Sequence, residues 1–111
     1  MSARLTTDFW VGAYLMRLQQ ENIPAYITRK GDPTAGAVLV KVSTLDGRAL
    51  AFQRSFDLMS GERAWVVLVE GGEREIDQAL SRQAGFDPDL WVIEIEDRAG
   101  RHLLDEAGFS A

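Results

Sequence analysis

Two glutamates near the carboxyl end of the chain, Glu94 and Glu96, have a spacing that can serve acid–base chemistry. They lie in the segment DPDLWVIEIEDRAGRH, which runs from Asp87 to the only histidine, His102. Side chains alternate along a strand, so both carboxylates would share one face, with Cα atoms roughly 6.5–7 Å apart. That distance overlaps the separation of roughly 6.5–9.5 Å between the carboxylates of inverting glycosidases. One of the two would need a raised pKa, and therefore burial, to donate a proton.

The same spacing is typical of an ordinary strand with one solvent-exposed face. Trp91, Ile93 and Ile95 would anchor the strand to the core, while the glutamates would pair with basic residues of neighbouring strands. Such cross-strand pairs contribute roughly 0.2–1 kcal/mol each. Candidate partners in other strand segments are Arg29, Lys41, Arg54 and Arg63. We favour this interpretation over a hydrolase that uses Glu94, Glu96 and His102.

His102 has carboxylates close by in the sequence, at Asp97, Asp105 and Glu106. A histidine beside carboxylates can bind a metal or relay protons. One histidine without any cysteine is a small ligand set for zinc or a redox metal, and the EF-hand pattern is absent. The sequence therefore predicts no metal site and no cofactor.

A glycine-containing segment, RKGDPTAGA (29–37), is the candidate ligand-binding loop. Backbone N–H groups of such a loop can hold a phosphate, with Arg29 and Lys30 directly before it. Neither the P-loop ending nor the dinucleotide fingerprint is present, because a strand rather than a helix follows. The alternative is a turn begun by Asp32 and Pro33. As a binding site, the loop would use Arg29, Lys30, Gly31, Asp32 and Gly36.

An apolar helix is predicted over residues 6–22 (TTDFWVGAYLMRLQQEN), and its apolar face is wider than one sheet requires. Phe9, Trp10 and Met16 widen it beyond the stripe formed by Val11, Tyr14, Leu15 and Leu18. A contiguous exposed apolar patch commonly marks a partner surface. We therefore expect Phe9, Trp10 and Met16 to contact a protein partner or a second copy in a homodimer, the commonest oligomer.

The remaining elements are predicted from periodicity and turn signals. Short turns, including Asp46-Gly47, connect four successive strand segments. We expect one α+β domain over residues 1–111, with a largely antiparallel five-stranded sheet and the helices packed on one face. The expected order is α-β-β-β-β-α-β-α, with strands at 25–30, 37–43, 49–56, 63–70 and 89–97 and helices at 6–22, 71–86 and 100–109. The position of the fifth strand stays open.

Composition excludes several classes of protein. At 111 residues the chain forms one domain with roughly two thirds of its unfolded surface buried. Its net charge of −5, with basic residues spread along the chain, argues against nucleic acid as a partner. It has no cysteine for disulfides or thiolate catalysis, and no apolar run long enough for a membrane span. We expect a cytoplasmic protein that does not bind membranes.

Two longer stretches, IPAYITRKGDPTAGAVLVKV and FDPDLWVIEIED, carry a resemblance to a known family. Across nearly its whole length the chain resembles a small family of uncharacterised, mostly alphaproteobacterial proteins, the domain of unknown function 1491. The resemblance implies family membership and a bacterial origin, and it transfers no catalytic or binding residue. The leading functional hypothesis is thus a non-enzymatic domain that acts through protein interaction or self-association. The alternatives are a small-ligand or phosphate-binding module and the hydrolase.

Overall fold

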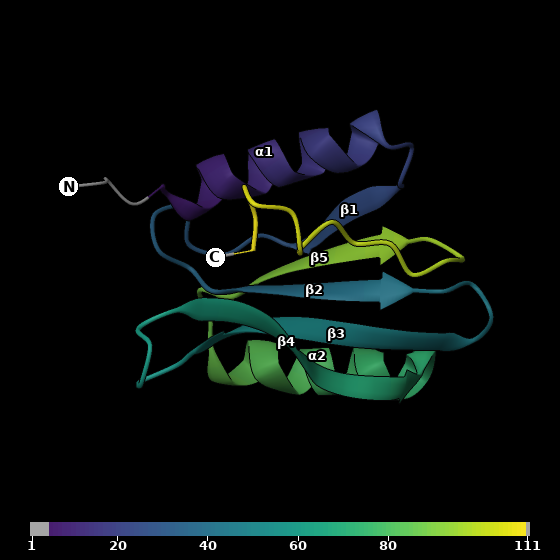
Figure 1. Cartoon of the computed structure of the whole chain (residues 1–111). Helices are drawn as coiled ribbons and strands as arrows, with labels where there is room; N and C mark the ends of the chain where they lie inside the picture. The colour runs from purple at the N-terminus through teal and green to yellow at the C-terminus, as the bar shows by residue number, and fades with distance from the viewer. Residues whose placement is uncertain (1–4, 111) are drawn as a thin grey trace.

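The computed structural model describes residues 5–110, which form two helices and a five-stranded sheet. Figure 1 shows the sheet with one helix above it and the other against its lower strands. The elements are α1 (Thr7–Gln20), β1 (Ala25–Arg29), β2 (Val38–Ser43), β3 (Arg48–Phe56), β4 (Arg63–Gly72), α2 (Glu73–Phe86) and β5 (Trp91–Glu96). The predicted α+β class and the five strands are confirmed. No helix among residues 5–110 is both long enough and apolar enough to cross a membrane.

The fifth strand lies inside the sheet, in the order β1-β5-β2-β3-β4. It pairs antiparallel with β1 and parallel with β2, with Val38 opposite Trp91 and Val42 opposite Ile95. The remaining neighbours pair antiparallel. The sheet is therefore mixed, because α2 carries the chain back across the sheet before β5 begins.

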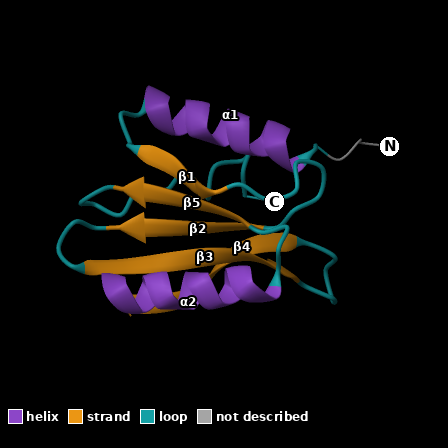
Figure 2. Cartoon of the chain, turned by 180° about the vertical axis from the view of Figure 1, so that it is seen from behind, coloured by secondary structure: helices purple, strands orange, loops and turns teal. Residues whose placement is uncertain are grey.

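The two helices cover opposite faces of the sheet, so the expectation that they pack on one face is wrong. Alternate residues of β2 and β5 belong to two separate cores. Val40 and Ile93 pack with Tyr14 and Leu18 of α1, whereas Leu39 and Val92 pack with Ile76 and Leu80 of α2. The view from behind in Figure 2 places α2 in front of β3 and β4, on the side away from α1. Every residue of β2 is consequently buried.

The predicted helix at 100–109 does not form. Residues 101–110 instead make a series of turns on the α1 side of the sheet. The hydroxyl of Tyr14 donates to the carbonyl of His102 at 2.6 Å, and the indole N–H of Trp65 donates to the carbonyl of Phe109 at 2.7 Å. Arg17 holds Glu106 with two hydrogen bonds. Tertiary bonds to these carbonyls replace the bonds of a helix.

Candidate functional site

Glu94 belongs to a four-residue ionic network on the α2 side of the sheet. The ammonium of Lys41, whose side chain is 3% exposed, lies 2.7 Å from Asp77, 3.1 Å from Glu73 and 3.2 Å from Glu94. Burial opposes the positive charge, but the hydrogen bonds that the ammonium donates to Asp77, Glu73 and Glu94 outweigh it and raise the pKa of Lys41. This is the cross-strand pairing expected of an ordinary strand, with two more carboxylates supplied by α2.

Glu96 lies on the same face as Glu94, near β1. Its negative charge, together with a hydrogen bond, raises the pKa of Tyr26. The strand alternates as predicted: Trp91, Ile93 and Ile95 lie in the α1 core, which leaves Glu94 and Glu96 on the other face.

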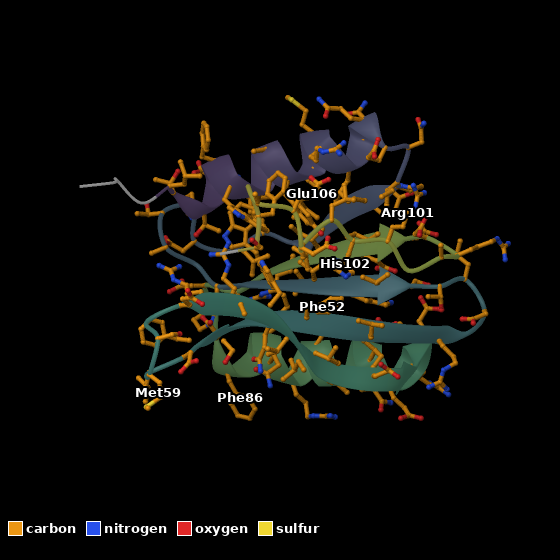
Figure 3. All side chains as sticks on the ribbon, viewed as in Figure 1. Phe52, Met59, Phe86, Arg101, His102 and Glu106 are labelled. Atoms are coloured by element: carbon orange, nitrogen blue, oxygen red, sulfur yellow. The ribbon has the colours of Figure 1, made fainter. Side chains whose placement is uncertain are left out.

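His102 lies on the α1 side, and the sheet separates it from the two glutamates. Its ring packs against Phe52, with ring centroids 4.6 Å apart, and Figure 3 shows the two side chains together below α1. The Nδ1 atom accepts a hydrogen bond from the backbone N–H of Leu104. Burial lowers the pKa of His102, and the charge of Asp105 opposes that shift. Because the structure does not bring His102 to Glu94 or Glu96, it offers no acid–base site built from these three residues.

The loop before β2 uses its polar groups to fix its own conformation. The carboxylate of Asp32 accepts hydrogen bonds from the backbone N–H groups of Thr34 and Ala35. The Asp32 N–H donates to the carbonyl of Asp89, and the Asp32 carbonyl accepts from the indole of Trp91. The loop is therefore fastened to the chain that leads into β5.

Gly31 and Gly36 allow this close approach. A Cβ atom would lie 2.1 Å from the carbonyl oxygen of Asp89 at Gly31, and 2.3 Å from the same atom at Gly36. Arg29 donates to the carbonyls of Leu90 and Pro88, so its guanidinium braces the start of β5. Lys30 is exposed. Arg29 lines a hollow with Lys41 and Glu94, whereas Gly36 lines a different cavity.

A cavity of about 390 Å³ lies where β2 and β3 separate. Their antiparallel ladder ends at the pair Val40–Phe52. Val38 and Leu39 on β2, and Gln53 and Arg54 on β3, come next and line the cavity. Of the predicted loop residues Gly36 lines it, and Trp10 and Arg63 contribute from α1 and β4.

The sequence did not predict that Arg54, Arg63 and Trp10 line one cavity. A signal for Arg54 exists in the sequence, since Leu50, Phe52 and Arg54 alternate along one strand and share its inner face. Arg63 and Trp10 come close to Arg54 only through the tertiary structure, so no local sequence pattern could have indicated them.

Of the predicted partner surface, Phe9 and Met16 are exposed, at 62% and 63%, whereas Trp10 is 6% exposed and belongs to the core. The expectation that Trp10 contacts a partner is therefore wrong. Leu5 is also exposed, at 59%. By helical spacing, Phe9, Gly12, Ala13 and Met16 share the outer face of α1, and Leu5 precedes the helix. We call these five exposed residues the α1 stripe.

The chain matches solved structures from two alphaproteobacteria. A crystal structure of a DUF1491 family protein from Caulobacter crescentus CB15 is 45% identical, with a TM-score of 0.84, and the match covers 93% of this chain and 97% of that one. An NMR structure of a DUF1491 family protein from the same organism is 44% identical, with a TM-score of 0.81 and coverage of 95% and 96%. A solution structure of a protein from A. tumefaciens is 30% identical, with a TM-score of 0.72 and coverage of 96% and 92%.

The search of curated proteins gave no match. The family model described as "Protein of unknown function (DUF1491)" matches residues 5–105, which confirms the resemblance seen in the sequence. This chain belongs to the DUF1491 family.

Proposed function

We propose that this is a non-enzymatic domain that acts by self-association, pairing with a second copy through the α1 stripe. The observation that carries the proposal is Gly12, in the middle of a helix with exposed apolar side chains on both sides of it. A glycine inside a helix costs about 1 kcal/mol relative to alanine. A Cβ added at Gly12 would meet no atom within 4 Å, so the fold of the monomer does not need a glycine there.

Close contact with a helix of a second molecule would explain the glycine at position 12. Small residues on a helix allow a second helix to approach closely, and Gly12 and Ala13 lie between Phe9 and Met16 on one face. The inner face of α1 is already occupied, because Trp10, Val11, Tyr14 and Leu18 are buried in the core. The outer stripe has no packing role within residues 5–110.

The stripe is complementary to itself. In an antiparallel pair with a two-fold axis at Gly12 and Ala13, Phe9 of each copy lies opposite Met16 of the other. Sulfur–aromatic contacts of this kind are favourable by about 0.3–1.5 kcal/mol. A two-fold contact also uses the same patch on both subunits, which a single self-complementary stripe provides.

Electrostatics favours this face for contact between like molecules. The chain carries a net charge of −5, so two copies repel each other over most orientations. The five residues of the stripe carry no charge, and the exposed glutamines Gln19 and Gln20 continue it toward the end of the helix. Two copies that meet by the stripe therefore bring no like charges together at its centre.

The test is sedimentation equilibrium of the Met16→Glu variant beside the wild-type protein. The glutamate introduced in each copy would face Phe9 of the other copy, and it is expected to weaken the dimer by about tenfold or more, because each charge loses water without gaining a partner. Met59→Glu is the matched control, since Met59 is 96% exposed on the β3–β4 turn, away from α1 in Figure 3. Equal dissociation by both variants, or a wild-type protein that is monomeric at millimolar concentration, would show that the α1 stripe is not the contact.

A further inference from the structure

Arg54 is a half-buried cation enclosed by two indole rings. Its guanidinium carbon lies 4.8 Å from the ring centroid of Trp10 and 4.9 Å from that of Trp65. Cation–π attraction and the rigid packing of both rings fix the guanidinium in one place. The same side chain lines the cavity between β2 and β3.

No carboxylate within the described residues 5–110 neutralises this cation. Among residues 5–110, neither Arg54 nor Arg63 forms an ion pair within 4 Å, although other cations of the chain do. Burial, followed by repulsion from Arg63, lowers the pKa of Arg54. Asp87 also lines the cavity, and its carboxylate accepts the backbone N–H of Asp89. The cavity is thus lined by two cations, Arg54 and Arg63, and by the carboxylate of Asp87, which forms its hydrogen bond with the backbone.

Two buried hydrogen-bond donors of this cavity wall have no partner among residues 5–110. They are Nε of Arg54 and Nε1 of Trp10, and the whole Trp10 side chain is only 6% exposed. A buried donor without an acceptor costs on the order of 1–3 kcal/mol, so native proteins rarely keep one without a reason. The other two indoles differ from Trp10, because Trp65 donates to Phe109 and Trp91 donates to Asp32.

We propose that this cavity is a binding site for a small phosphorylated organic molecule, with Arg54, Arg63 and the indole N–H of Trp10 holding the phosphate group. Nε of Arg54 and Nε1 of Trp10 have no acceptor in the described part of the chain, and a phosphate offers three strong acceptor oxygens. Guanidinium groups match that geometry with paired N–H donors. A phosphate monoester carries a charge near −2 at pH 7, which balances two arginines.

The rest of the cavity fits the organic part of such a ligand. Ala37, Val38, Leu39 and Leu90 provide apolar walls, and Gly36 brings the loop backbone to the edge. A volume of about 390 Å³ lies within the range of small-molecule sites. Of the two glycines in the phosphate loop predicted from the sequence, this site keeps Gly36, and it uses two arginines from β3 and β4 in place of Arg29 and Lys30.

The test is NMR titration of the full chain with phenyl phosphate, read at the three indole N–H signals. We expect the Trp10 signal to shift most, while the Trp65 and Trp91 signals, which already have acceptors, move little. Inorganic phosphate and benzoate should each bind about tenfold more weakly, because the first lacks the apolar part and the second lacks the second charge. Binding of either as tight as that of phenyl phosphate would overturn the ligand class.

Substitution at Arg63 tests the site itself. Arg63→Gln is expected to weaken phenyl phosphate binding by about tenfold, since it removes one charged contact while leaving the Trp10–Arg54–Trp65 stack in place. The matched control is Arg82→Gln, on the exposed surface of α2. An absent Trp10 shift, unchanged affinity in Arg63→Gln or an equal loss in Arg82→Gln would each overturn the proposal.

Discussion

Replacing Lys41 by alanine is expected to destabilise the protein by about 2–3 kcal/mol, because it leaves three carboxylates without their shared cation. Asp77 and Glu73 from α2, and Glu94 from β5, all lie within 3.2 Å of the Lys41 ammonium. The three acids retain some contact with water, which keeps the cost below that of a fully buried pair. Urea unfolding measures the change.

Two further variants separate charge from packing at Lys41. Lys41→Met keeps the apolar stem and should cost less than Lys41→Ala, since it creates no cavity. Asp77→Asn removes only the most exposed of the three acids and should cost about 1 kcal/mol or less. If Lys41→Ala costs no more than Asp77→Asn, the network does not join α2 to the sheet as described.

Gly31→Ala is expected to cost about 3 kcal/mol or more, because overpacking against backbone atoms cannot be relieved by a side-chain rotation. The added Cβ would lie 2.1 Å from the carbonyl oxygen and 2.7 Å from the carbonyl carbon of Asp89. The loop would have to move away from β5 and give up the bonds from Arg29 to Leu90 and from Asp32 to Asp89.

Thermal and urea unfolding of Gly31→Ala should be compared with Gly85→Ala. Gly85 is in α2, and nothing lies within 4 Å of a Cβ placed there. That alanine should stabilise the protein by about 0.5–1 kcal/mol through helix propensity. Similar unfolding midpoints for the two variants would contradict the close approach at Asp89.

Local pattern predicted most of the elements, and tertiary context decided their arrangement. Helical spacing predicted α1 and α2, and turn residues predicted the boundaries of the first four strands. That the two helices cover opposite faces of the sheet could have been expected from β5, where Trp91, Val92 and Ile93 are consecutive apolar residues. Such a run is typical of a strand covered on both sides, inside a sheet rather than at its edge.

The terminal segment was mispredicted because its best hydrogen-bond partners are distant in sequence. The carbonyls of His102 and Phe109 bond to Tyr14 and Trp65, which no local pattern around residues 100–109 indicates. Similarly, periodicity alone assigned Trp10 to the outer surface of α1. Its ring stacks on Tyr14 at a centroid distance of 4.9 Å and touches Trp65, and that aromatic cluster explains its burial.

The most direct test of self-association through the α1 stripe is cross-linking of a single introduced cysteine. The chain has no cysteine of its own, so Ala13→Cys would report only on its own surroundings. The two-fold pairing places residue 13 of both copies near the axis, and mild oxidation should therefore give mainly disulfide-linked dimer. Gln78→Cys, on the exposed side of α2, should remain largely monomeric under the same conditions. Equal and slow cross-linking of both variants would contradict the proposed pairing.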